Sequence, residues 1–263
     1  GDARSAYRQL SESPIPAPHG LAAQLILPWI EGAAGVRASA TIPDQTAALG
    51  ELQRLTLFQR AQVLDASRRR DDAEALYRLV ASDPTGQSLY TLGYGQFLER
   101  EGRRPEAIAL YEAAIAARPR ESVFALARDR AQARRRPPPA TDFKQGAADA
   151  LVLASGLASA NGANEFAAVY LRLSLNLAPS DEARLALGTT LARAGLGSAA
   201  RAAFLSIGTE NPNYYLAARA NLAGSLAENG EDEAALAAIQ DAARVNPEDA
   251  RIARLLAGQY LQL

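Results

Sequence analysis

GTTLARAGLGSAARAAFLSIGTENP, residues 188–212, and AGSLAENGEDEAALAAIQDAARVNP, residues 223–247, match each other at fixed offsets. Each segment starts on a small residue, with leucine 3 positions later, glycine at 7, alanine at 12, apolar residues at 16 and 19, and proline at 24. Apolar residues spaced by three and four are typical of amphipathic helices, and glycine and proline mark helix ends. The pattern predicts a repeated unit of two helices joined by a short turn.

Two further segments, residues 95–119 and 155–179, carry the same offsets, and a looser copy ends at Pro84. The matched positions are Gly95, Leu98, Gly102, Ala107, Tyr111, Ala114 and Pro119, and then Ser155, Ala158, Gly162, Ala167, Leu171, Ser174 and Pro179. The prolines that close the five copies are separated by 35, 60, 33 and 35 residues. Three of these spacings are near the period of about 34 residues of helix-pair repeats. The 60-residue gap indicates an interruption.

Each repeated position has an expected physical role. The small residue and the leucine mark the inner stripe of the first helix, where a neighbouring backbone comes close. The glycine, as at Gly195 and Gly230, provides a left-handed helix C-cap without a steric penalty. The alanine five residues later, as at Ala200 and Ala235, lets the second helix pack tightly against the first. The proline then ends the second helix.

These positions resemble the repeats of the tetratricopeptide-repeat (TPR) family, over about residues 54–119 and 148–247 with partial repeats at both ends. The resemblance implies an all-α fold, a right-handed superhelical α-solenoid of antiparallel helix pairs. The large aromatic residue that the family has near the start of the first helix is replaced here by Thr91, Leu151, Arg184 and Arg219. More narrowly, the chain is similar to the interior of longer alphaproteobacterial TPR proteins of unassigned role.

We expect two lobes, residues 1–136 and 140–263, separated by the proline run at 137–139, which favours an extended spacer over a helix. In the first lobe, residues 2–12 form the second helix of a partial repeat, and 18–34 and 41–52 a divergent pair. Regular pairs follow at 54–82 and 87–117, with an extra helix at 121–135. The second lobe consists of repeats at 148–179, 181–212 and 216–247 and an unpaired last helix, 249–263.

Composition narrows the functional classes. The net charge is −1 with a single lysine, Lys144, so no global charge directs the chain to nucleic acid or an anionic membrane. The absence of cysteine excludes disulfides, thiolate metal sites and cysteine nucleophiles. The sequence has no apolar stretch of the roughly 18 residues that a membrane span needs. Because the chain has no methionine, even at its start, we expect a fragment of a longer protein. The use of arginine in place of lysine indicates a bacterial source. The compartment stays open, and the resemblance to alphaproteobacterial proteins favours the periplasm over the cytoplasm.

No residue pattern predicts catalysis, a metal site or a cofactor site. His19, the only histidine, lies between Pro18 and Gly20 in an expected loop, so no serine has a histidine partner other than this one. Gly93 and Gly95 lack the third glycine and the preceding strand of a nucleotide-binding loop. The acidic residues at 71–72 and 231–233 are expected to stabilise the starts of second helices. The sequence therefore predicts a protein that is not an enzyme.

A cluster of arginines precedes the proline run: Arg128, Arg130, Arg134, Arg135 and Arg136. Two interpretations remain open, a patch for an acidic protein partner and a solvated helix end at which cations face the negative end of the helix dipole. Nucleic acid is disfavoured because no aromatic side chains alternate with the arginines to stack on bases.

The TPR resemblance places the binding surface on the groove formed by the first helices. The residues at groove-facing positions are Leu89, Leu92, Gln96, Glu99, Arg100, Asp149, Val152, Gly156, Ser159, Glu182, Leu185, Thr189, Ala192, Arg193, Ala217, Ala220, Asn221 and Gly224. The lysine, asparagine and arginine set with which chaperone-binding members hold a C-terminal carboxylate is missing. The groove is therefore expected to have small, weakly polar side chains, open to a peptide or protein segment or filled by the protein's own neighbouring repeats.

The leading functional hypothesis is a non-enzymatic scaffold or adaptor that binds a protein or peptide in this groove. Two alternatives remain. The chain is a regulatory or substrate-docking segment of a larger enzyme, or it is a structural solenoid that self-associates through its apolar last helix around Leu255, Leu256 and Leu261.

Overall fold

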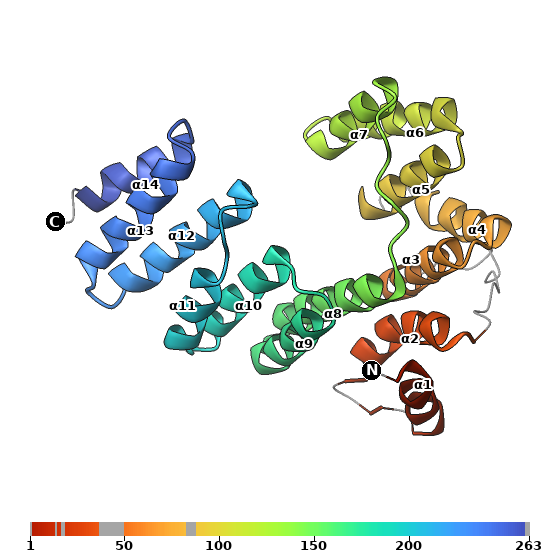
Figure 1. Cartoon of the computed structure of the whole chain (residues 1–263), viewed down its shortest axis with the longest axis horizontal. Helices are drawn as coiled ribbons and strands as arrows, with labels where there is room; N and C mark the ends of the chain where they lie inside the picture. Colours follow the sequence, from red (N-terminus) through yellow and green to blue (C-terminus); the bar gives the residue numbers. More distant parts are fainter. Residues whose placement is uncertain (1, 14, 17–18, 37–49, 83–87, 261–263) are drawn as a thin grey trace. The chain divides into compact units, whose positions relative to one another are not determined.

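The computed structural model describes residues 2–13, 15–16, 19–36, 50–82 and 88–260, in which it contains fourteen α-helices and no β-strand (Figure 1). The helices are α1 (Ala3–Glu12), α2 (Gly20–Ala34), α3 (Glu51–Ala66), α4 (Arg70–Ala81), α5 (Ser88–Arg100), α6 (Arg104–Ala117), α7 (Ser122–Gln132), α8 (Phe143–Ala160), α9 (Asn164–Leu177), α10 (Asp181–Arg193), α11 (Gly197–Leu205), α12 (Pro212–Ala227), α13 (Asp232–Val245) and α14 (Ala250–Tyr260). The predicted all-α fold of helix pairs is confirmed.

The chain divides into two compact units, Gly1–Ala147 and Ala148–Leu263, which we call the N-terminal and the C-terminal unit. In the N-terminal unit α3 packs on α4, α5 on α6, and α6 on α7. In the C-terminal unit α9 packs on α10, α10 on α11, and α12 on α13. The long helix α8 contributes its first turn to the N-terminal unit and its remainder to the C-terminal unit.

The turns between paired helices follow the repeat pattern. Gly102, Gly162, Gly195 and Gly230 all have left-handed backbone conformations, with φ between 73° and 79°. Around Gly102, for example, the glycine N–H donates to the Glu99 carbonyl and the next N–H to the Leu98 carbonyl, which satisfies the free carbonyls at the helix end. The looser repeat lacks the glycine, and Arg68 adopts φ 59° in its place. The predicted glycine C-caps are confirmed.

In two of the regular repeats, the glycine that opens the repeat makes room for a ring from the second helix of the same repeat, and not for a neighbouring backbone as its pattern suggested. A Cβ atom at Gly95 would lie 2.3 Å from the Tyr111 ring, and one at Gly188 would lie 2.4 Å from the Phe204 ring. Both rings are fully buried. Glycine is needed at these positions because any side chain would collide with the ring.

The other two regular repeats pack their two helices at the same position with side chains of different sizes. Where the first position is larger, Ser155 or Ala223, the residue sixteen positions later is aliphatic, Leu171 or Ile239. All four side chains are buried. The two helices of a repeat are thus matched in volume at this position, as close packing requires.

The alanine at the twelfth offset is completely buried in every repeat, at Ala73, Ala107, Ala167, Ala200 and Ala235. Replacing Ala235 by leucine is therefore expected to destabilise the protein by about 1–3 kcal/mol, because the added atoms have no space at the helix interface. Urea unfolding monitored by circular dichroism measures this. The control is Ala237→Leu, at an exposed position of α13, which is expected to unfold like the wild type. Equal stabilities of the two variants would contradict the register.

The repeats are interrupted after α7. Helix α7 ends at Gln132, slightly earlier than expected, and residues 135–142, which include the three prolines, have no regular secondary structure. At the other end of the N-terminal unit, α1 and α2 occupy two of the expected segments, and His19 stands at the N-cap of α2. Most of the expected helix at 41–52, Pro84 and the apolar end at 261–263 lie outside the described residues.

Within the part of the chain that the structure describes, no helix is both long and apolar enough to cross a bilayer.

Candidate functional site

In the N-terminal unit, the predicted groove residues lie on α5 and are partly or fully engaged by the protein itself. Leu89, Leu92 and Gln96 are half-buried. Glu99 is buried, with 0% of its side chain exposed. The Tyr111 hydroxyl donates to the Glu99 Oε1 atom at 2.8 Å, and the Arg130 guanidinium pairs with the same oxygen. Burial, followed by the hydrogen bond to Glu99, raises the pKa of Tyr111 above its usual value. The Glu99 carboxylate therefore binds Tyr111 and Arg130 of its own unit, although its position was predicted to face a partner.

Arg100 is also held by the chain. Its Nη2 atom pairs with the Asp65 carboxylate on α3 at 2.5 Å, and both side chains are largely buried. Its Nη1 atom donates to the backbone carbonyl of Pro138 at 3.1 Å. The groove position of Arg100 is thus in contact with the extended segment that follows α7.

The arginine cluster separates in the structure. Arg130 turns inward to Glu99, whereas Arg128 pairs with its neighbour Asp129 at 2.6 Å. The remaining three, Arg134, Arg135 and Arg136, are exposed beyond the end of α7. The proposed patch for an acidic partner is therefore reduced to the exposed arginines.

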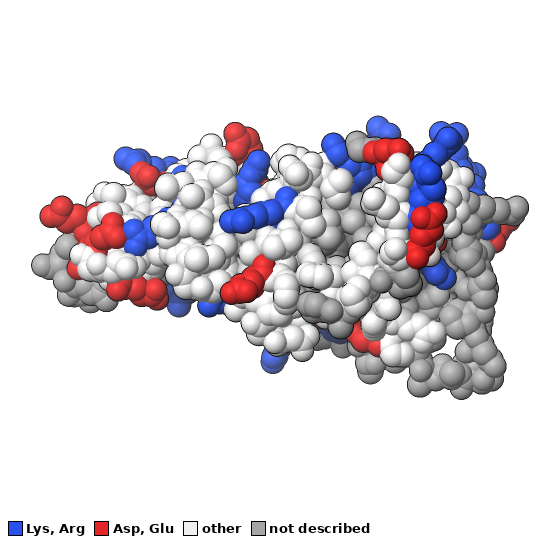
Figure 2. Space-filling view, turned by 90° about the horizontal axis from the view of Figure 1, so that it is seen from below, with Lys and Arg blue, Asp and Glu red and all other residues white. Residues whose placement is uncertain are grey.

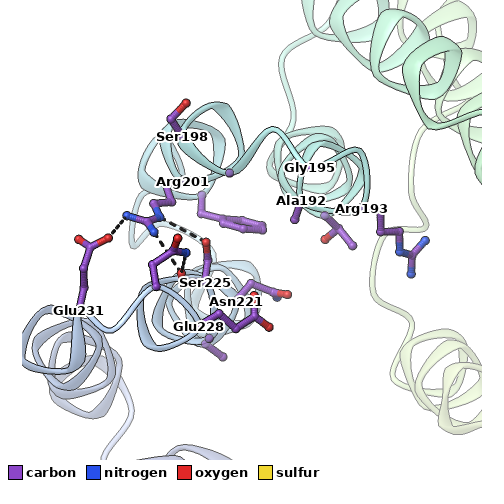
Figure 3. Close-up of a pocket in the computed structure, with 15 residues that line it drawn as sticks. Ala192, Arg193, Gly195, Ser198, Arg201, Asn221, Ser225, Glu228 and Glu231 are labelled. Atoms are coloured by element: carbon purple, nitrogen blue, oxygen red, sulfur yellow. Dashed lines mark hydrogen bonds and ion pairs between the residues drawn. The ribbon is translucent and has the colours of Figure 1, made fainter.

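In the C-terminal unit, the structure brings six predicted groove residues together in one cavity of about 980 Å³ between α10, α11, α12 and the start of α13 (Figure 3). These residues are Thr189, Ala192 and Arg193 from α10 and Ala220, Asn221 and Gly224 from α12. A Cβ atom at Gly224 would meet no atom within 4 Å, so this part of the cavity floor is open.

One wall of the cavity is formed by residues that the sequence analysis missed. Arg201 on α11 pairs with the Glu231 carboxylate at 2.6 Å, and donates to the hydroxyl and the backbone carbonyl of Ser225 at 3.3 and 3.1 Å (Figure 3). These bonds link α11 to the end of α12 and the start of α13. Arg201 stands on a second helix, outside the groove positions of the repeat. The sequence signal that could have identified Arg201 is its place directly after Ala200, the buried alanine at the twelfth offset of the repeat.

Each of the two amide side chains of the cavity donates one hydrogen bond to a backbone carbonyl of α12. Asn221 Nδ2 donates to the Ala217 carbonyl at 2.8 Å, and Asn229 Nδ2 donates to the Ser225 carbonyl at 2.7 Å. Each amide is thereby oriented by α12, and its Oδ1 atom is a hydrogen-bond acceptor. The cavity can therefore receive groups that donate N–H bonds, such as the backbone of a polypeptide.

The charges of the cavity balance. Arg193 and Arg201 are matched by Glu228 and Glu231, and all four line the same space. Figure 3 shows that Arg193 extends away from Arg201, so the two cations are not concentrated at one point. Over the C-terminal unit, on the left of Figure 2, most of the surface is white, with charged side chains scattered across it. This arrangement favours a neutral or mixed-charge ligand over a multiply charged anion.

A smaller cavity, of about 210 Å³, adjoins the first. Ala220 and Gly224 line both, and the second is closed on its far side by Arg254, Leu255 and Gly258 of α14. The two spaces therefore form a path over α12 from α10 to α14. Leu255, which was expected to support self-association, is 42% exposed here, and its neighbour Leu256 packs against the core of the unit.

Two of the remaining groove residues, Asp149 and Glu182, lie in the first halves of α8 and α10. Burial, followed by the negative charge of Asp149 on α8, raises the pKa of Glu182 on α10. Burial and then the charges of Glu182 and Asp181 raise the pKa of Tyr214 on α12. The structure thus brings residues from three first helices together at this end. Of the other predicted residues on these helices, Val152 and Leu185 pack against the core, Gly156 is exposed, Ala217 is half-buried and Ser159 contributes a buried hydroxyl.

Among the described residues, no group of three or more histidine, cysteine, aspartate or glutamate side chains is arranged to hold a metal ion.

No protein-family model matches this chain, and no curated protein matches it. Several solved structures are similar. YrrB, a TPR protein with an unusual peptide-binding site, is 19% identical, with 79% of this chain and 91% of YrrB covered and a TM-score of 0.36. TTC0263, a TPR protein of Thermus thermophilus, is also 19% identical, with 79% and 99% covered and a TM-score of 0.38. The TPR2AB domain of yeast Sti1, in complex with an Hsp90 peptide, is 13% identical, with 98% and 97% covered and a TM-score of 0.37.

At this identity and TM-score, the similar structures do not indicate what the chain binds. The fold follows from the chain's own features, namely the fixed offsets of its repeats, the left-handed glycines between paired helices and the buried alanines at their interfaces. The chain therefore has a TPR-type fold.

Proposed function

We propose that this protein is a non-enzymatic interaction scaffold whose C-terminal unit binds a peptide segment of a partner protein in the cavity between α10 and α13. The observation that carries the proposal is the meeting of Thr189, Arg193, Ala220, Asn221 and Gly224 in one cavity of about 980 Å³. A cavity of this volume is within the range of ligand-binding sites.

The chemistry of the cavity supports a polypeptide over a small charged metabolite. Asn221 and Asn229, whose side chains carry acceptor oxygens, line a space with a floor of small residues, Ala220 and Gly224, which allow close approach of a backbone. The cationic side chain of Arg201 is already engaged by Glu231 and Ser225, so it serves as a fixed wall. A peptide main chain offers regularly spaced N–H donors without a net charge, which matches these features.

The double variant Thr189→Glu/Gly224→Glu is expected to lose peptide binding by at least about tenfold, because two added carboxylates narrow the cavity and disturb its charge balance. Peptides are first selected on the wild-type chain from a phage-displayed library, and each is then titrated by fluorescence anisotropy. Because Gly224 has open space for a side chain, the helices are expected to remain folded, which circular dichroism checks.

The matched control is Val169→Glu/Leu173→Glu, which adds the same two charges at exposed positions of α9. This control is expected to bind the selected peptides as the wild type does. If both double variants bind equally well, the binding surface lies outside the cavity and the proposal fails.

A further inference from the structure

The first-helix face of the N-terminal unit is crossed by a segment of the chain itself. Residues 135–147, which we call the strap, comprise the extended stretch after α7 and the first turn of α8. In Figure 1 the strap runs from α7 past α5 to α8. All of it belongs to the N-terminal unit.

Three contacts along the strap attach it to this face. Near its start, the Pro138 carbonyl accepts the hydrogen bond from Arg100 on α5. In its middle, the Phe143 ring lies against Gly32 of α2 and near Val63 of α3, so close that a Cβ atom at Gly32 would be 2.6 Å from the ring.

The third contact is at the end of the strap. Gly146 lies directly on the Trp29 indole ring, where a Cβ atom would be 2.2 Å from the nearest ring carbon. Trp29 is 1% exposed, and its indole N–H donates to the side-chain oxygen of Gln59 on α3. The strap therefore completes the burial of the unit's tryptophan.

The strap uses a residue at a partner-binding position of the repeat. Arg100 was predicted as a groove residue, and the structure shows it bound to the Asp65 carboxylate and to a main-chain carbonyl of the strap. The strap thus presents a main-chain carbonyl to an arginine and, five residues later at the start of α8, an aromatic ring to Gly32, which are contacts that a bound peptide can also make.

We infer that the strap is an internal ligand of the N-terminal unit, and that this face binds an external segment of the same chemistry once the strap is displaced. That segment contains a proline in an extended stretch, and then a helical turn that begins with an aromatic residue about five positions after the proline whose carbonyl meets Arg100. This inference concerns a different surface from the C-terminal cavity and stands independently of the function proposed there.

The strap explains why the two units differ as binding surfaces. In the C-terminal unit the described residues leave an open cavity beside the first helices, whereas in the N-terminal unit the chain covers the first-helix face itself. A closed strap reduces the apparent affinity for an external segment by the fraction of time that the face is open. Release of the strap would therefore control access.

The test uses Trp29, the only tryptophan of the chain, as a reporter. Its quenching by acrylamide is measured in the wild type, in Phe143→Ala, and in the control Tyr260→Ala, which removes an exposed aromatic ring from α14. The wild type and the control are expected to be weakly quenched. Phe143→Ala is expected to be quenched several-fold more, because the strap no longer holds Gly146 on the indole.

A synthetic peptide of residues 134–147, which contains no tryptophan, is then added in trans. It is expected to restore the protection of Trp29 in Phe143→Ala, and to bind the wild type about tenfold more weakly because the strap occupies the face there. The same peptide with its phenylalanine replaced by alanine is expected to bind neither. Adding Arg100→Gln to Phe143→Ala is expected to weaken peptide binding.

Two results would overturn the inference. One is a Phe143→Ala variant with intact helical circular dichroism that the peptide leaves unprotected, and the other is equal binding of the peptide to the wild type and to this variant. If Phe143→Ala loses its helices, the same titrations are made on Pro137→Gly/Pro138→Ser/Pro139→Gly, which keeps Phe143 and makes the strap flexible. If this triple variant is folded and does not bind the peptide more tightly than the wild type, the inference is equally overturned.

Discussion

Replacing Glu99 by leucine is expected to destabilise the N-terminal unit by about 3 kcal/mol, because the substitution leaves one member of a buried ion pair without its partner. The Glu99 side chain is 0% exposed, and the Arg130 side chain is 22% exposed. Without the carboxylate, the Arg130 guanidinium and the Tyr111 hydroxyl both lose an acceptor inside the unit. The expected loss is at the lower end of the usual range because Arg130 retains some access to water.

The measurement is urea unfolding monitored by the fluorescence of Trp29, which reports on the unit that contains the substitution. The single variant Arg130→Leu and the double variant Glu99→Leu/Arg130→Leu complete a double-mutant cycle. We expect the double variant to be more stable than Glu99→Leu, since it buries no unpaired charge. Additive effects of the two substitutions would show that the pair does not act as a unit.

Replacing Phe204 by alanine is expected to destabilise the C-terminal unit by about 3–5 kcal/mol, the usual cost of deleting a buried phenylalanine ring. The ring is 1% exposed and fills the space left by Gly188 on the first helix of its repeat. Since Phe204 also borders the candidate cavity, its removal enlarges that cavity at the same time. Urea unfolding monitored by circular dichroism measures the loss.

A second experiment adds volume at Gly188, the residue against which the Phe204 ring packs. Gly188→Ala alone is expected to be destabilising, because the new methyl group overlaps the Phe204 ring. Adding Phe204→Leu to Gly188→Ala is expected to recover part of the loss, since the next repeat combines Ala223 with the aliphatic Ile239 at these positions. A Gly188→Ala variant as stable as the wild type would show that the helices can separate without cost.

Repeat spacing predicted the role of the turn glycines fully, but the role of Gly95 and Gly188 only in part. The turn glycines were predicted correctly because a left-handed C-cap is a local property of a few backbone residues. At Gly95 and Gly188 the spacing correctly identified a close approach but assigned it to a backbone. The ring that fills the space comes from sixteen residues away, and its placement depends on how the two helices pack.

In the candidate site, too, some features follow from local sequence and others only from helix packing. Thr189, Arg193, Ala220, Asn221 and Gly224 were found from their positions in the repeat, because the same offset faces the same way in each first helix. Arg201 was missed because its contribution depends on hydrogen bonds to the end of α12 and the start of α13. Repeat position describes the direction of a side chain from its own helix, and not the groups it meets.

The sequence by itself determined the helix-pair unit, its turns, its buried alanines and the break at the proline run, because each depends on local backbone preferences repeated at a constant spacing. Only the tertiary structure decided that Glu99 and Arg130 pair inside the N-terminal unit, and that Arg100 holds the strap. Charged side chains on a helix surface have no local property that separates a partner-binding position from an internal ion pair. Their role is set by which other helix or segment comes within hydrogen-bond distance, and that is a result of packing.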